Sequence, residues 1–237
     1  MKKTFFICMT LFLVHSACMA QINTLTESEK AQGWKLLFNG KNLDGWTSTG
    51  KDAPPAFGWV INDGVLTVMK EGDRRGGDII TKEQFSDFEL LIDFRVTTGA
   101  NSGIKYFFTR YEKGGWLGLE YQIIDDDTHP DAKLGRDGNR RQAGLYDMFA
   151  PLENANKPVG EWNQARIVSK GSSVEHYLNG KKTVSFDRKS KAYADALELS
   201  KYKGSIPAFG DVEQGYIHLQ DHGDVVSFRN IKIRVLK

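Results

Sequence analysis

The sequence predicts an all-β protein, an antiparallel β-sandwich with one or two short peripheral helices. Residues 88–96 carry an apolar side chain at every second position, the period-two pattern of a strand that covers a core. Asn179 and Gly180 separate two short apolar segments and are typical of a two-residue hairpin, because both central positions of a type I′ turn need a positive φ. Many further segments of strand type and very little helical pattern favour a sandwich or barrel.

Two short helices are expected beside the strands. Thr26 and Glu29 form a capping box, which predicts a helix of about two turns that ends near Gly33. A second helix is expected at residues 191–202, as a lid on a sandwich edge, because its apolar side chains follow a helical spacing: Tyr193, Ala196, Leu197 and Leu199.

The other strands are expected at residues 59–61, 65–68, 104–109, 119–124, 165–169, 174–178, 182–186, 216–220 and 225–235. No internal repeat or linker divides this region, so residues 21–237 are expected to form one domain. Two long irregular stretches remain, residues 125–146 and 151–161. Loops of this length in a compact domain are usually functional, so the chemistry is expected there.

The first twenty residues have the order of a secretory signal. Lys2 and Lys3 precede an apolar run at 4–14, and small residues follow up to Ala20, where we expect cleavage and export to the periplasm or cell surface. The alternative is a lipoprotein that begins at Cys18, although the residues before it lack the leucine of a usual lipobox. Mass spectrometry of the mature N-terminus distinguishes the two. The run is too short to span a bilayer, and no transmembrane segment is expected elsewhere.

The net charge of the sequence restricts the partners it can bind, and its cysteine content restricts the disulfides it can form. The chain of 237 residues has a formal net charge of +2, and removal of Lys2 and Lys3 balances the remaining basic residues against 30 acidic ones. A neutral chain has no electrostatic footprint for nucleic acid or an anionic membrane, so a neutral partner such as a carbohydrate is expected. Cys8 and Cys18 are the two cysteines of the sequence, which predicts a folded domain without a disulfide.

Two predicted strands share an unusual polar face. Glu120 and Gln122 point to one side of the strand at 119–124. On the strand at 216–220 the same side carries His218 and Gln220, and His222 follows in register if that strand continues. A merely solvated face would more often carry Lys, Thr and Ser than Gln with two His. The pattern indicates a polar binding groove, although a lone Glu or His on a strand is most often structural.

Other residues are weaker candidates. The run Asp125 to Asp127 is explained by a turn or by a site for a divalent cation, and no cofactor is certain. His129 starts the long loop and suits an acid, a base or a ligand. Trp116 lies among glycines, which suits stacking on a sugar ring. Arg140 and Arg141 in the long loop are solvated, form salt bridges or contact substrate oxygens. No phosphate loop, nucleophile elbow or catalytic cysteine occurs, so cofactor-dependent redox chemistry has no support.

Several short motifs in order resemble the 3-keto-disaccharide hydrolase family, whose fold is a concanavalin A-like jelly roll. The likeness runs from about Gly33 to Lys237 and is carried by Leu37–Trp46, Asn101–Ile104, Glu120–Asp125, Ala143–Asp147, Trp162–Asn163, Leu178–Gly180, Gly215–Gly223 and Phe228–Ile231. It implies cleavage of glycosides already oxidised at C3. The keto group acidifies the hydrogen on C2, so a base can remove it, the enolate expels the C1 leaving group, and water adds to the alkene.

Such a site needs a base, a donor or cation at the enolate oxygen, and an acid for the leaving oxygen. From this chemistry we hypothesise that Glu120 or His222 is the base. His129 and Gln220 are then expected near the enolate or leaving oxygen. Substrate binding is expected from Asn101, Gln122, Asp125, Trp116, Arg141, Tyr146 and His218.

Two other functions fit the same groove. A retaining glucanase needs two carboxylates about 5 to 5.5 Å apart, but the segment that starts at Glu120 has Gln122 where such enzymes carry a central carboxylate. A non-catalytic carbohydrate-binding module of lectin type would use the same polar groups and aromatic platform. Turnover of an oxidised and an unoxidised aryl glucoside separates the three functions.

Overall fold

The computed structural model describes residues 22–69, 74–204, 206 and 209–237. The expected signal at 1–20 and both cysteines lie outside this range. The elements are α1 (Glu27–Ala31), β1 (Lys35–Leu36), β2 (Trp46–Ser48), β3 (Trp59–Asn62), β4 (Val65–Val68), β5 (Ile79–Phe85), β6 (Phe88–Val96), β7 (Asn101–Tyr111), β8 (Gly115–Ile124), the 3₁₀ helix η1 (Pro130–Lys133), β9 (Asn163–Lys170), β10 (Ser173–Leu178), β11 (Lys181–Asp187), α2 (Lys191–Glu198), β12 (Gly215–Leu219) and β13 (Val226–Val235).

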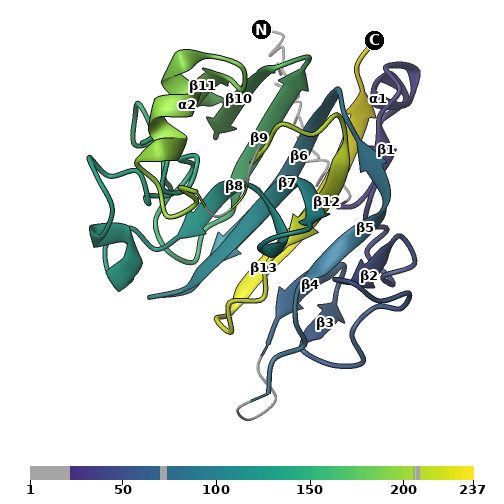
Figure 1. Ribbon diagram of the computed structural model, residues 1–237. Coiled ribbons are helices and arrows are strands. Elements are labelled where there is room, and N and C mark those ends of the chain that lie inside the picture. Colours follow the sequence, from purple (N-terminus) through teal and green to yellow (C-terminus); the bar gives the residue numbers. More distant parts are fainter. Residues whose placement is uncertain (1–21, 70–73, 205, 207–208) are drawn as a thin grey trace, which may run out of the picture.

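The strands form two antiparallel sheets that share one core (Figure 1). The eight-stranded sheet has the order β11-β10-β9-β6-β13-β4-β3, with β1 paired to β13, and the five-stranded sheet has the order β2-β5-β12-β7-β8. The predicted all-β antiparallel sandwich of jelly-roll type is therefore confirmed. No helix within the described residues is long and apolar enough to cross a membrane.

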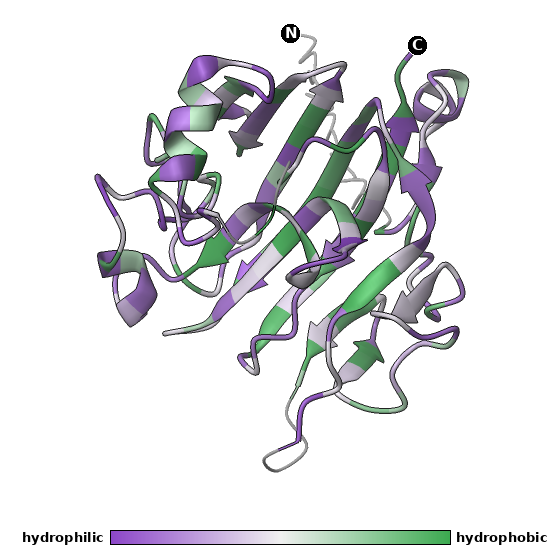
Figure 2. Cartoon of the chain, in the orientation of Figure 1, coloured by the Kyte–Doolittle hydropathy of each residue, from purple (hydrophilic) through white to green (hydrophobic). Residues whose placement is uncertain are grey.

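The strict alternation of apolar and polar residues predicted the position of β6 well. In β6 the residues Phe88, Leu90, Ile92, Phe94 and Val96 are all buried, as the pattern predicts. Bands of hydrophobic and hydrophilic residues alternate along several strands in Figure 2. From the second sheet, Tyr106 packs edge-on against Phe88, with ring centroids 6.2 Å apart. The core lies between the sheets, so the outer face of the five-stranded sheet is left for polar residues.

Several elements differ from the sequence-based expectation: the short strands β1 and β2 and the 3₁₀ helix η1 were not predicted. β5 was not predicted, because its buried and exposed positions do not alternate; its pairing with β2 and β12 makes it a strand. The helix expected at 191–202 is α2, which ends at Glu198. Leu199 is a cap residue with 64% of its surface exposed, so its place on the buried face was wrong. The short α1 has the predicted capping box at Thr26.

A buried histidine makes the core sensitive to acid. His176 is fully buried, its Nε2 lies 2.8 Å from the hydroxyl of Tyr106, and burial lowers its pKa from the ordinary 6.5 to about 3. Between these pH values the unfolded chain binds a proton that the folded chain does not. The folded state therefore loses stability as the pH falls from 6.5 toward 3, by about 1.4 kcal/mol per pH unit from this group.

We therefore expect His176→Gln, which keeps polar atoms near Tyr106 but does not titrate, to flatten the decline of the unfolding free energy between pH 6 and pH 4. Urea unfolding at several pH values measures this slope, and any constant cost of the substitution cancels in it. His218 is also buried with a pKa lowered by burial and contributes equally to both proteins. An unchanged slope in the variant would show that His176 takes up a proton in the folded protein.

Candidate active site

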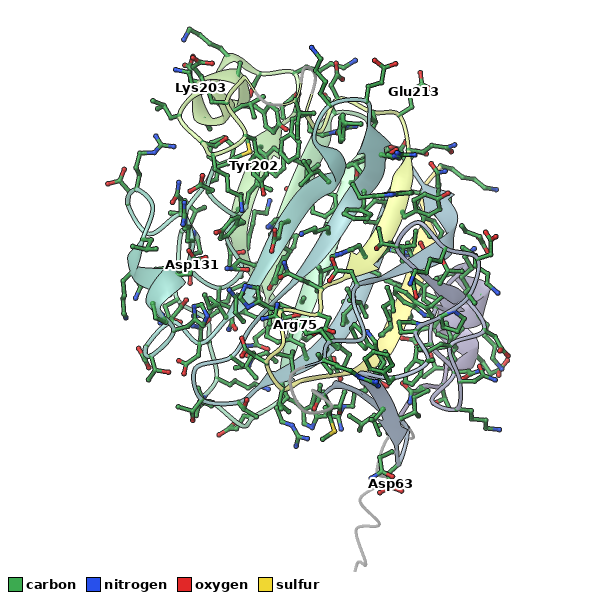
Figure 3. All side chains as sticks on the ribbon, turned by 60° about the horizontal axis from the view of Figure 1, so that its bottom comes forward. Asp63, Arg75, Asp131, Tyr202, Lys203 and Glu213 are labelled. Atoms are coloured by element: carbon green, nitrogen blue, oxygen red, sulfur yellow. The ribbon has the colours of Figure 1, made fainter. Side chains whose placement is uncertain are left out.

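A cavity of about 300 Å³ lies on the outer face of the five-stranded sheet. Its floor comes from β7, β8 and the residue after β12, and its walls come from the loop after β8, the segment after α2 and the loop before β13. Asp131 and Tyr202, labelled in Figure 3, belong to two of these walls. The lining residues are Asn101, Lys105, Leu117, Glu120, Gln122, His129, Asp131, Tyr146, Lys201, Tyr202, Gln220 and His222.

Glu120 is the buried carboxylate of this floor. It is 6% exposed, and Lys105, its partner residue across the β7–β8 ladder, places Nζ 3.6 Å from Glu120 Oε2. The carboxylate lies directly over Gly103, where an added Cβ would be 2.4 Å from Glu120 Oε1. The missing side chain at Gly103 therefore provides the space that the carboxylate occupies.

A second cation, Lys201, lines the cavity from the segment after α2. Its Nζ is 4.2 Å from the centroid of the Tyr146 ring, and partial burial of the ammonium lowers its pKa. Burial, together with the hydrogen bond to Asp131, raises the pKa of Tyr146 well above its ordinary value. The phenol therefore stays protonated and donates a 2.8 Å hydrogen bond to Asp131 Oδ2.

Arg140 holds in place the wall segments that carry Asp131 and Lys201. Its Nη1 is 2.8 Å from Asp131 Oδ1, and its Nε is 2.7 Å from Asp147 Oδ1. Asp147 Oδ2 in turn accepts a 2.6 Å hydrogen bond from the backbone N–H of Lys201. Arg140 thus joins the loop after β8 to the segment after α2.

Two histidines lie at the rim in different hydrogen-bonding states. His222 Nδ1 is 3.4 Å from Asp224 Oδ2, and the same oxygen accepts a 3.1 Å hydrogen bond from the N–H of Asn101. A proton on Nδ1 facing Asp224 leaves Nε2 of His222 as the basic nitrogen. His129 Nδ1 accepts a 3.1 Å hydrogen bond from the N–H of Asp131, so its neutral ring carries the proton on Nε2 and can donate it.

The two histidines and Asp224 also form a candidate metal site. The ligand atoms of His129, His222 and Asp224 lie within 4.8 Å of one another, and two imidazoles with one carboxylate suit a divalent transition metal. Coordination through His129 would require this ring to give up either its proton on Nε2 or its hydrogen bond from Asp131. In the tautomers that the hydrogen bonds favour, these residues suit proton donation and acceptance better than metal binding.

The structure brings most of the predicted site residues together. Residues from the polar faces of both strands and from the long loop line the one cavity: Asn101, Glu120, Gln122, His129, Tyr146, Gln220 and His222. The strand before His222 ends at Leu219, so this residue reaches the cavity from a loop and not from a continued strand. Lys105 and Lys201 were missed. Lys105 lies two residues after Gly103 on the same strand, and this spacing could have identified it as a residue of the same strand face. No sequence signal places Lys201 in the cavity.

His218 is on the predicted face of β12 but does not reach the cavity. It is fully buried beneath Phe108, with ring centroids 4.3 Å apart, and its Nε2 lies 2.9 Å from Asp78 Oδ2. His218 therefore lies outside the cavity lining, and its expected contact with substrate stays a prediction. It instead joins β12 to the segment before β5.

Asp125, Arg141 and Trp116 also lie away from this cavity. Asp125 accepts backbone hydrogen bonds from Gly99 at 2.8 Å and Asp127 at 3.0 Å, so it ties the loop to β7 and does not face a ligand. The neighbouring Asp126 is similarly occupied by the N–H of Gln142 and the amide of Asn156, which supports the turn and not the cation site at 125–127. Arg141 and Trp116 line two further cavities.

Comparison with known proteins shows which proteins this chain resembles. Residues 33–234 match the model of the 3-keto-alpha-glucoside-1,2-lyase-like domain. A 3-keto-disaccharide hydrolase of Bacteroides thetaiotaomicron is 38% identical over 242 residues, which cover 92% of this chain and 83% of that protein. Two crystal structures from Parabacteroides distasonis, both assigned provisionally as glycosyl hydrolases, are also similar. One has a TM-score of 0.80 at 33% identity and covers 91% of this chain and 100% of the other. The second has a TM-score of 0.67 at 31% identity, with 86% and 99% covered.

Proposed function

Because the chain belongs to the 3-keto-alpha-glucoside-1,2-lyase-like family and is a hydrolase-like enzyme, we propose that it cleaves 3-keto-glycosides by elimination and hydration. The observation that carries this proposal is the composition of the cavity floor. A buried carboxylate, Glu120, lies beside Lys105 and lines, together with Lys201, a polar cavity that suits a sugar ring. Such a set matches a base beside a developing enolate.

The first step removes the hydrogen on C2. Glu120 takes this proton, and the electron pair of the C–H bond forms the C2=C3 bond of an enolate whose charge is on the C3 oxygen. Glu120 is the better base for this step because it is fixed on the sheet over Gly103, whereas His222 lies on a loop at the rim with 42% of its side chain exposed.

The two lysines stabilise the enolate. Its negative oxygen needs a donor or cation that is already in place, and preorganised charge of this kind often accounts for most of an enzyme's rate enhancement. Lys105 is held on β7 beside Glu120, and Lys201 is held over Tyr146 by the link through Asp147. The lowered pKa of Lys201 also suits it to donate a proton.

The second step breaks the bond from C1 to the leaving oxygen. The enolate electrons return to form the C1=C2 bond next to the C3 carbonyl, and the leaving oxygen takes a proton. Nε2 of His129 or of protonated His222 can supply that proton, since both rings line the cavity rim. Water then adds across C1=C2, with its hydroxyl at C1 and a proton at C2, so the net reaction is hydrolysis.

The carboxylates of the cavity argue against a retaining glucanase. Glu120 and Asp131 are the two acidic residues among the described lining, and Asp131 already accepts from Tyr146 and pairs with Arg140. A retaining mechanism needs a free nucleophilic carboxylate as well as an acid. Elimination needs a single carboxylate, and this agrees with Glu120.

Hydrolysis in deuterium oxide tests the proposal. We expect the released 3-keto-sugar to carry deuterium at C2, and an aryl glucoside without the C3 keto group to remain uncleaved. The free 3-keto-sugar without enzyme controls for slow exchange. Cleavage of both aryl glucosides without deuterium at C2 would indicate a glucanase, and binding without cleavage of either would indicate a lectin-type module; each result overturns the proposal.

We also propose that the enzyme is exported. Support comes from the charged, apolar and small-residue order of positions 1–20, which lie outside the described residues. Mass spectrometry of the mature chain should show Gln21 as the first residue, and an acylated Cys18 or an intact N-terminus would contradict the cleavage site.

A further inference from the structure

A second cavity lies beside the first on the same face of the five-stranded sheet. It has a volume of about 460 Å³ and is lined by Thr47, Gly50, Lys51, Asp52, Ile80, Thr81, Lys82, Trp116 and Tyr216. These residues come from β2, the loop after it, β5, β8 and β12. The sequence predicts that Trp116 binds substrate, and in the structure Trp116 lines this second cavity and not the first.

The aromatic wall of this second cavity is held rigidly. Trp116 stacks on Phe108, with ring centroids 5.7 Å apart and an interplanar angle of 22°, and it lies 6.1 Å from the ring of Tyr216. Phe108 reaches this face because a bulge at Phe107, with φ of 50°, shifts the register of β7. Gly118 makes room for the bulge, since an added Cβ there would lie 2.8 Å from Phe108 Cα. The indole is therefore fixed before any ligand arrives.

Three charged side chains of the lining and the polar atoms of its two aromatic residues are unpaired within the described residues. Lys51, Asp52 and Lys82 are exposed and form no ion pair within the described part of the chain. Trp116 and Tyr216 are half-buried, and neither their indole nitrogen nor their phenol has a hydrogen-bond partner among the described residues. An aromatic wall beside free donors and acceptors of both charge signs suits a neutral, polyhydroxylated ring such as a sugar.

Strand register links the two cavities. Ile80 of β5 is opposite His218 of β12, His218 is opposite Lys105 of β7, and Lys105 is opposite Glu120 of β8. Ile80 lines the second cavity, whereas Lys105 and Glu120 line the first. Neighbouring strands are about 4.8 Å apart, so two strand spacings, or about 10 Å, separate Ile80 from Lys105. Between them the ring of Phe108 covers the buried His218.

We propose that the cavity at Trp116 and Tyr216 is a second sugar subsite, which binds a sugar residue attached to the 3-keto ring. The substrate would then be an oxidised oligosaccharide and not only a simple 3-keto-glucoside. The claim about the substrate of the reaction rests on the proposed function. The claim that a sugar binds at Trp116 does not depend on it. A subsite that binds substrate and transition state equally well lowers KM and leaves kcat unchanged, so loss of this subsite should raise KM alone.

The test compares Trp116→Ala with Trp162→Ala. Trp162 is a half-buried tryptophan that packs on Arg95 and Arg229 of the other sheet, so it is a matched control away from both cavities. We expect Trp116→Ala to raise KM for 3-keto disaccharides and trisaccharides by about three- to tenfold, as expected for a lost aromatic contact, with kcat unchanged. KM for methyl 3-keto-glucoside should stay as in the wild type. Equal changes on both substrates, or none, would overturn the subsite.

A binding measurement keeps the two proposals apart. Calorimetric titration of unoxidised glucose disaccharides and trisaccharides should show binding to the wild type and to Trp162→Ala, with affinity reduced in Trp116→Ala. This holds even if no 3-keto-glycoside is cleaved, which would refute the proposed reaction alone. If methyl 3-keto-glucoside is cleaved but the three proteins bind the oligosaccharides equally, the subsite is refuted and the reaction stands.

Discussion

Replacing Glu120 with glutamine is expected to lower kcat on a 3-keto-glucoside by about 10²- to 10⁴-fold, the range lost when a general base is removed. The amide keeps the size of the carboxylate over Gly103 and can still contact Lys105, but it cannot accept the C2 proton. KM should change little, because the shape of the cavity floor is preserved. Steady-state kinetics on an aryl 3-keto-glucoside measures both constants.

Glu112→Gln provides the matched control. Glu112 is an exposed carboxylate in the turn between β7 and β8, so the same chemical change there should leave kcat as in the wild type. Exchange of the C2 hydrogen in deuterium oxide then identifies the base. Glu120→Gln should abolish exchange, whereas His222→Ala should retain it and lose most activity on substrates with poor leaving groups. The opposite pattern would give the role of base to His222, and turnover near the wild-type rate in both variants would remove both from the reaction.

Gly103→Ala is expected to have the second-largest effect. Its new methyl group would lie 2.4 Å from Glu120 Oε1 and 3.0 Å from Glu120 Cδ, so the carboxylate must move. Displacement of a catalytic group by about 1 Å can cost about 10²-fold in rate, and we expect a loss of that order in kcat. The backbone at Gly103 does not have the positive φ that alanine avoids, and the obstructing atoms belong to a side chain, so the fold should be retained.

Gly45→Ala is the control for this change. The nearest atom to an added Cβ at Gly45 is the carbonyl oxygen of Leu37 at 3.5 Å, an ordinary contact, and Gly45 also lacks a positive φ. Circular dichroism and thermal unfolding should show both variants folded, with kcat reduced in Gly103→Ala alone. Wild-type kcat in a folded Gly103→Ala protein would mean that the position of Glu120 does not matter for the rate.

Local pattern was sufficient for most of the secondary structure and for part of the site. The alternation in β6 depends on residues two positions apart, so the sequence shows it directly. The same rule put Glu120 and Gln122 on the outer face, and they line the cavity. β5 lacks this alternation and became a strand through its neighbours, so no local pattern could identify it.

Residues on the same face of a strand do not all line the same site. Trp116 and Glu120 both belong to β8, yet they line different cavities. His218 has the expected face of β12, but the bulge at Phe107 brings the ring of Phe108 over it. The period of a strand gives the side to which a residue points and not what covers it.

The sequence by itself determined the two-sheet antiparallel fold, the resemblance to the family and the polar groups of the sheet, because these depend on short-range spacing and residue type. Only the tertiary structure decided which cations line the cavity with Glu120. Lys105 reaches it through the register of β7 with β8, and Lys201 arrives from beyond α2 through the link between Arg140 and Asp147. Contacts between residues far apart in the chain depend on register and loop path, which local patterns do not encode.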